Sequence, residues 1–176
     1  KMPGSVIGIM LPASVSAAIV YLAAIFSGKI PVMINWTVGK SNMQHCLKTA
    51  SVSNIITAKA LLEKLKNQGL DYSSIDVNWI ELENIVKKIS ILKKALSYIK
   101  SIVSLRFLSK SEISDTAAIL FTSGSEAKPK AVPLSHYNFL SNLKDFSTTL
   151  HFYSNDRLLG MLPPFHSLGL AGTIIM

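Results

Sequence analysis

The sequence predicts an α/β domain with a layered, mostly parallel sheet flanked by helices. Short apolar runs of strand length alternate with segments of helical periodicity, an order typical of parallel strands joined by helical crossovers. One apolar run leads directly into a loop of hydroxyls, glycine and lysines, and α/β sheets bind ligands at the carboxyl ends of their strands. The expected strands are Val6–Leu11, Ile30–Ile34, Asn54–Thr57, Asn78–Leu82, Ala117–Thr122 and Arg157–Leu162.

Composition places the chain among globular proteins. Its 176 residues are 49% hydrophobic with a mean hydropathy of +0.37, which is enough for one substantial core. With no repeat and no low-complexity linker, a single domain is expected over residues 1–176. The single cysteine, Cys46, excludes an internal disulfide framework, and Lys1-Met2 does not resemble a native start followed by a signal peptide. The expected location is therefore the cytoplasm.

Residues 13–26 are almost all small or apolar and could be mistaken for a membrane span. The run ends at Gly28-Lys29, with Pro31 beyond, and is shorter than the roughly 20 residues that a bilayer requires. We expect a buried helix instead.

The loop after the fifth expected strand has the chemistry of a phosphate site. Hydroxyls donate hydrogen bonds, glycine lets backbone N–H groups turn toward an anion, and lysines supply positive charge. The pattern is not a Walker A loop, because such a loop has Ser or Thr directly after its lysine, whereas Ala131 follows Lys130 here. It is not a dinucleotide-binding fingerprint either, because no Gly-x-Gly-x-x-Gly follows any apolar run. A nucleotide polyphosphate is the expected ligand. The candidate binding residues are Thr122, Ser123, Gly124, Ser125, Lys128 and Lys130.

The segment Thr122-Ser123-Gly124-Ser125, followed by Pro129-Lys130, closely resembles the signature of the acyl-adenylate-forming (AMP-binding) enzymes. Residues 28–35, 123–126 and 155–170 are similar to one branch, the acyl-[acyl-carrier-protein] synthetase part of bifunctional 2-acylglycerophosphoethanolamine acyltransferases. The resemblance covers essentially the whole chain. It implies a fragment of the large N-terminal domain, without the C-terminal subdomain, that is inactive by itself.

The resemblance also implies a reaction and roles for the candidate residues. A fatty-acid carboxylate attacks the α-phosphorus of Mg·ATP, and a thiol of acyl-carrier protein or CoA then displaces AMP, in phospholipid acyl turnover. Thr122, Ser123, Ser125 and Lys130 would hold the β- and γ-phosphates, while Lys128 lies at a variable position. His166 would contact the acyl carboxylate as the catalytic residue. No residue spacing predicts a protein metal cage, so magnesium is expected to arrive with ATP.

The loop departs from the family pattern at three positions. Ala127 and Ala131 stand where relatives usually have glycine, and alanine at positive φ would be strained by roughly 1–2 kcal/mol. Glu126 replaces the usual threonine, although the acyl-carrier-protein branch also has glutamate there. Glu126 therefore marks the branch, whereas Ala127, Ala131 and the missing second half of the family pattern keep open the alternative of a degenerate or truncated nucleotide-binding relative without turnover.

The other histidines are expected to be structural. His136 and Asn138 should cap or orient the helix after the loop. His45 and His151 are expected at the surface.

The net charge of +8 is concentrated in a predicted basic amphipathic helix over residues 85–103. Its apolar residues recur every three or four positions, with Lys87, Lys88, Lys93, Lys94 and Lys100 beside or opposite them. Three interpretations remain open: a packed helix with a solvated lysine face, a helix on the inner membrane surface, and a docking site for acidic acyl-carrier protein.

Nucleic-acid binding is an alternative of a different class, since an isoelectric point near 9.6 and lysine clusters are its usual electrostatic footprint. The basic segment contains few aromatic residues and a single arginine, Arg106, and no recognition motif is present. These observations argue against it.

Overall fold

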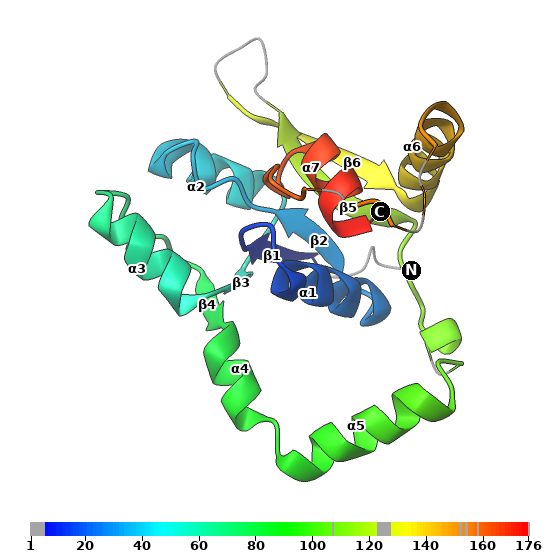
Figure 1. Cartoon of the computed structure of the whole chain (residues 1–176). Coiled ribbons are helices and arrows are strands. Elements are labelled where there is room, and N and C mark those ends of the chain that lie inside the picture. Colours follow the sequence, from blue (N-terminus) through cyan, green and yellow to red (C-terminus); the bar gives the residue numbers. More distant parts are fainter. Residues whose placement is uncertain are drawn as a thin grey trace.

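The computed structural model describes residues 6–106, 108–122, 128–151, 153, 155–157 and 159–175, except the side chain of Ser109. Its centre is a six-stranded sheet in the order β4-β3-β1-β2-β5-β6 (Figure 1). The first five strands run parallel and β6 runs antiparallel beside β5, so the predicted fold class is confirmed. The strands are β1 (Val6–Met10), β2 (Ile30–Met33), β3 (Asn54–Thr57), β4 (Asn78–Glu81), β5 (Thr116–Thr122) and β6 (Lys130–Ser135).

Helices connect most of the strands and cover both faces of the sheet. They are α1 (Val15–Phe26), α2 (Lys40–Thr49), α3 (Lys59–Asn67), α4 (Leu82–Lys88), α5 (Ile91–Val103), α6 (His136–Thr149) and α7 (Ser167–Leu170). A 3-10 turn (Leu108–Lys110) precedes β5, and a π-helical turn (Ala171–Ile175) continues α7.

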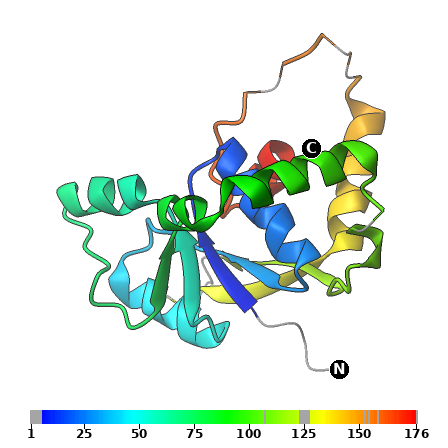
Figure 2. The same cartoon turned by 90° about the horizontal axis from the view of Figure 1, so that it is seen from below.

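The core consists of two apolar clusters, one on each face of the sheet, because successive strand residues point to opposite faces. Ile9 of β1 belongs to the cluster that contains residues of α1, α6 and α7. Met10, the next residue, belongs to the cluster that contains residues of α2 and α3. In Figure 2, α1 and α7 lie on the same side of the sheet.

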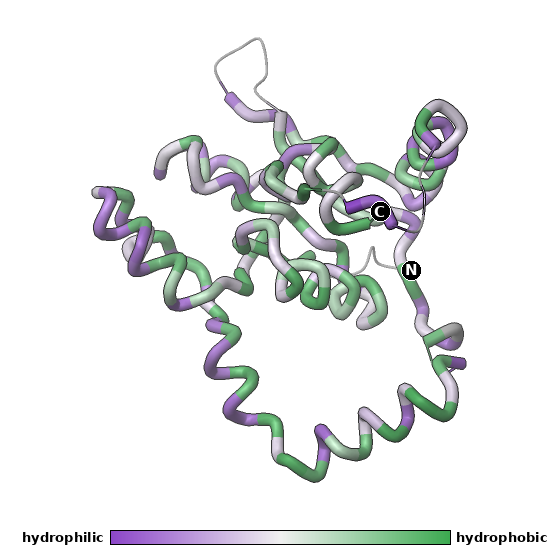
Figure 3. Tube along the Cα trace, viewed as in Figure 1, coloured by the Kyte–Doolittle hydropathy of each residue, from purple (hydrophilic) through white to green (hydrophobic). Residues whose placement is uncertain are grey.

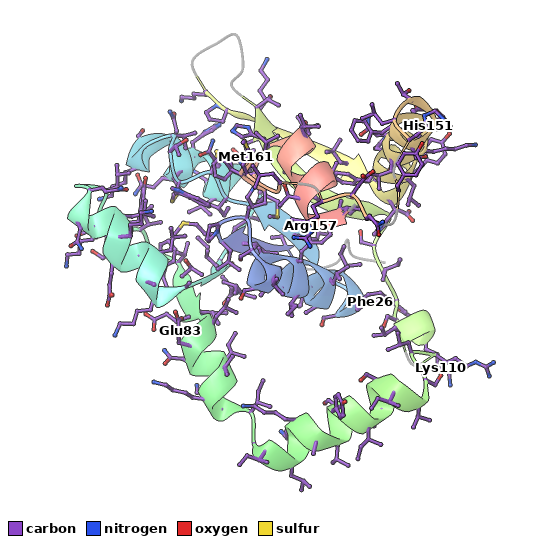
Figure 4. The ribbon with its side chains drawn as sticks, viewed as in Figure 1. Phe26, Glu83, Lys110, His151, Arg157 and Met161 are labelled. Atoms are coloured by element: carbon purple, nitrogen blue, oxygen red, sulfur yellow. The ribbon has the colours of Figure 1, made fainter. Side chains whose placement is uncertain are left out.

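The expected buried helix is α1, and only one of its faces is buried. Ser14 caps its N-terminus by accepting a hydrogen bond from the Ala17 N–H at 3.2 Å. The turn that ends it contains Gly28 at φ +71°, a conformation that favours glycine. Its outer face is apolar and exposed at Val15, Ile19, Leu22 and Phe26, the last at the C-terminal end of the helix (Figure 4). None of the described helices is long and apolar enough to cross a membrane.

The sequence interpretation missed β6, where it placed only loop before the next helix. Residues 130–135 pair with β5 from Thr122↔Lys130 to Thr116↔Ser135. Pro133 has no N–H to donate, but it is tolerated because β6 is an edge strand with a neighbour on one side only.

The predicted strand Arg157–Leu162 was wrong. Its described residues, 157 and 159–162, form no strand, and the side chains of Leu159, Met161 and Leu162 are exposed. None of the six strands of the sheet pairs with these described residues.

The predicted helix over residues 85–103 is in fact two helices, α4 and α5. Ile89 has an extended backbone, and Ser90 begins α5 by accepting a hydrogen bond from the Lys93 N–H at 3.3 Å. The serine cap therefore explains the break. In Figure 1, α4 and α5 form an arm that extends away from the sheet.

Candidate functional site

The stem of the predicted phosphate loop is the β5–β6 hairpin. Thr122 ends β5, Lys130 begins β6, and the two residues lie opposite each other in the antiparallel ladder. Opposite residues project to the same face, so Thr122 and Lys130 share a face with the Leu120–Val132 pair. Both side chains are exposed, as is Lys128 outside the ladder. Ser123, Gly124 and Ser125, together with Glu126 and Ala127, lie outside the described residues.

Ala131 is not strained. It pairs with Phe121 inside β6, and Ser51 is the only non-glycine residue with positive φ in the described part of the chain. Its position in a strand removes the need for the glycine that relatives usually have there.

The other candidate residue, His166, lies in the turn that begins α7. His166 donates its backbone N–H to the Pro163 carbonyl at 3.1 Å and accepts at its own carbonyl from the Leu170 N–H at 2.8 Å. The preceding Phe165 is buried and contacts Trp36 edge to face, with ring centroids 4.8 Å apart. Phe165 therefore anchors the turn, while the His166 side chain remains exposed.

Gly169 lets this turn close tightly. A Cβ added to Gly169 would lie 2.1 Å from the Pro163 carbonyl oxygen, which is far inside van der Waals contact. Only glycine fits at this position, and the sequence reading gave no reason for it.

The two groups of residues meet in one cavity of about 690 Å³. Thr122 and His166, which are distant in the sequence, both line its wall, whereas Lys128 and Lys130 do not. The ladder register nevertheless places Lys130 on the same face of the hairpin as the lining residue Thr122. The lining residues are Ile34, Asn35, Val38, Asn42, Met43, Cys46, Leu120, Phe121, Thr122, Pro129, Val132, Leu134, Phe165, His166, Ser167 and Leu168.

The side chains that line the cavity are largely apolar, with a few polar groups. The described lining residues include no aspartate or glutamate. Burial raises the pKa of the Cys46 thiol to about 11, so the thiol stays protonated at neutral pH and acts as an apolar wall residue rather than a nucleophile. Such a cavity can hold an organic molecule with an apolar part, beside the predicted phosphate loop.

Two contacts around the cavity were missed from the sequence. The Asn35 side-chain oxygen accepts hydrogen bonds from the N–H and the hydroxyl of Thr37, at 2.9 and 2.7 Å, which fixes the chain after β2. The half-buried His45 donates from Nε2 to the Pro129 carbonyl at 3.2 Å and so links α2 to the start of β6. His45 is therefore a structural residue, as expected, but it is half-buried rather than fully at the surface.

The remaining histidines lie away from the cavity. Asn138 caps α6 as expected, in a reciprocal pair with Ser135: each residue donates its backbone N–H to the side chain of the other. His136 is the first residue of α6 and does not provide the cap. His151 is exposed beyond the C-terminal end of α6 (Figure 4). The described residues include no cluster of three or more metal-ligating side chains.

Comparison with known proteins identifies the family. The family model for AMP-binding enzymes matches residues 2–176. A probable 4-coumarate–CoA ligase of Dictyostelium discoideum is 30% identical over 186 residues, covering 95% of this chain and 33% of the relative. A chloroplastic long-chain-fatty-acid–[acyl-carrier-protein] ligase of Arabidopsis thaliana is 43% identical over 53 residues, covering 30% of this chain and 7% of the relative.

Solved structures support the fold. The o-succinylbenzoate coenzyme A synthetase of Bacillus subtilis, in complex with ATP and magnesium ion, matches with a TM-score of 0.69 at 20% identity. That match covers 99% of this chain and 42% of the synthetase. The chain spans about a third of the length of the curated relatives that match it along most of its own length. Because the family model covers the chain almost from end to end, this chain belongs to the AMP-binding enzyme family.

Proposed function

We propose that this chain is part of an ATP-dependent acid–thiol ligase that activates a fatty acid as its acyl-adenylate. The observation that carries the proposal is the shared cavity of Thr122 and His166, at the carboxyl end of a parallel strand in an AMP-binding family member. The cavity wall thus contains Thr122, where the predicted phosphate loop begins, together with the imidazole of His166 and apolar side chains.

Thr122 and Lys130 would act on the phosphates of Mg·ATP. A hydroxyl donor and an ammonium group on one face of the hairpin would hold the β- and γ-phosphates, which positions the α-phosphorus and neutralises negative charge. Among the described residues that line the cavity, none is a carboxylate that would repel a polyphosphate. Magnesium would enter as part of this substrate.

His166 would hold the carboxylate of the second substrate. Its ring can donate a hydrogen bond to a carboxylate in the cavity, while wall residues such as Met43 and Leu134 contact the hydrocarbon part of the acid. A carboxylate oxygen then bonds to the α-phosphorus as the bond to pyrophosphate breaks. In the second step, a thiolate sulfur bonds to the acyl carbon and AMP leaves.

We further propose acyl-carrier protein as the thiol acceptor, and phospholipid acyl turnover as the setting, with CoA as the alternative acceptor. Support comes from the similarity of residues 28–35 and 155–170 to the acyl-carrier-protein branch. The Arabidopsis relative, whose name specifies acyl-carrier protein, points in the same direction. An excess of product with acyl-carrier protein over product with CoA, measured with the complete polypeptide, tests this choice.

The main test is fatty-acid-dependent exchange of labelled pyrophosphate into ATP, with the polypeptide extended to its natural ends. Lys130→Ala should lower exchange by about a hundredfold, the usual effect of removing one charge-stabilising donor. Lys144→Ala is the matched control, because this exposed lysine of α6 does not line the cavity, and it should leave exchange unchanged. A folded, complete protein that binds ATP without exchange would favour the degenerate relative instead.

A further inference from the structure

The strongest feature outside the cavity is the uncovered apolar side of α5. No residue of this helix is buried, and its large apolar side chains range in exposure from 51% at Leu96 to 85% at Ile91. Figure 1 shows α5 apart from the sheet, joined to it through α4 and the 3-10 turn. In water this exposed aliphatic surface is unfavourable, so it indicates a ligand or partner.

The apolar and basic residues of α5 are separated around the helix axis. Successive helical residues are about 100° apart, so the aliphatic residues and Tyr98 occupy one sector of about 160°. Lys94 lies at one margin of the opposite sector, and Lys93 and Lys100 lie at the other. The hydropathy colours alternate along α5 accordingly (Figure 3). Lysines at these margins can reach headgroup phosphates while the apolar sector faces hydrocarbon.

The charge of the surrounding segment has a single sign. Residues 84–111 contain none of the chain's 10 acidic residues. The segment contains seven basic ones, which are Lys87, Lys88, Lys93, Lys94, Lys100, Arg106 and Lys110. Seven positive charges beside an exposed apolar sector complement an anionic, apolar surface.

We propose that α5 is a membrane-surface helix that binds anionic lipid bilayers. Its 13 residues extend over about 20 Å, too short to cross the hydrocarbon core but suited to lying in the interface. A nucleic acid would engage the lysines and leave the aliphatic sector in water, and an acidic protein would need an apolar surface of its own to cover that sector. The exposed face of α1 differs, since that helix contains no charged residue and nothing specifies its partner.

Vesicle flotation of the complete polypeptide tests the proposal. The protein should float with vesicles of equal parts phosphatidylcholine and phosphatidylglycerol, and much less with phosphatidylcholine alone. Leu96→Glu places a charge in the apolar sector and should weaken binding at least about tenfold. Ser97→Glu, the matched control, makes the same charge change in the polar sector and should weaken binding by about fivefold or less.

Three results would overturn the proposal. The first is absence of wild-type flotation with anionic vesicles. The second is equal weakening by both variants, which would mean that charge alone attracts the protein. The third is a lower melting temperature in Leu96→Glu than in Ser97→Glu, which would show that protein covers the apolar sector. Flotation requires no turnover, so these outcomes are independent of the ligase proposal.

Discussion

Replacing Gly169 with alanine should disturb the His166 turn in a predictable way. The new Cβ would lie 2.1 Å from the Pro163 carbonyl oxygen and 2.8 Å from the carbonyl carbon. Because these neighbours are backbone atoms, the turn and α7 must separate by about 1 Å to reach an ordinary contact. Such overpacking costs about 1–3 kcal/mol in the free energy of unfolding. A displacement of this size near a reacting group can lower the rate about a hundredfold.

Gly172→Ala supplies a matched control three residues later. A Cβ at Gly172 meets no atom within 4 Å, so the same chemical change should leave stability unchanged or raise it by about 0.5–1 kcal/mol. Urea unfolding and fatty-acid-dependent pyrophosphate exchange, both on the complete polypeptide, measure the two effects. Equal free energies of unfolding and equal exchange rates for Gly169→Ala and Gly172→Ala would refute the close packing of the Pro163 carbonyl against Gly169.

Two further predictions concern the sheet and its helices. The backbone N–H groups of Glu83 and Lys59 hold the pKa of the Glu83 carboxyl below its usual range, and the carboxylate accepts the Lys59 N–H at 3.0 Å. Glu83→Gln should therefore lower the free energy of unfolding by about 0.5 kcal/mol at neutral pH. The difference should disappear as acid protonates the wild-type carboxyl, and a difference that persisted in acid would contradict this reading. Thr57→Val removes a buried hydroxyl that donates to the Met10 carbonyl at 2.9 Å, and should cost about 1–2 kcal/mol in urea unfolding. If Thr57→Val had the same free energy of unfolding as the wild type, the hydrogen bond from Thr57 to Met10 would contribute nothing to stability.

Most of the parallel strands could be predicted from sequence because they contain short apolar runs, of which β1 and β2 are largely buried. The two errors in the strand predictions, the missed β6 and the run Arg157–Leu162, both depend on whether a segment lies beside a sheet edge. Pro133 argues against a strand in general, yet an edge strand tolerates it. The run Arg157–Leu162 has strand-like composition, but a strand forms only where the chain lies beside a sheet edge, and local sequence does not reveal that position. The break before α5 did have a local signal, the capping serine Ser90.

The candidate site was predictable only in part. The hydroxyls and lysines of the loop and His166 were predicted from their motifs, and of these residues Thr122 and His166 line the cavity. That Thr122 and His166 line one cavity depends on the packing of α7 against the β5–β6 hairpin, which no local pattern encodes. The bond from His45 to Pro129 similarly depends on the position of α2 beside β6.

The central claim is that a carboxylate attacks the α-phosphorus of ATP in this site. The most direct measurement uses a long-chain fatty acid with heavy oxygen in its carboxylate, incubated with the complete polypeptide, Mg·ATP and the acceptor thiol. Adenylation transfers one labelled oxygen to AMP, and this is the expected result. Label in inorganic phosphate, with ADP as the nucleotide product, would instead show attack on the γ-phosphorus and contradict the claim.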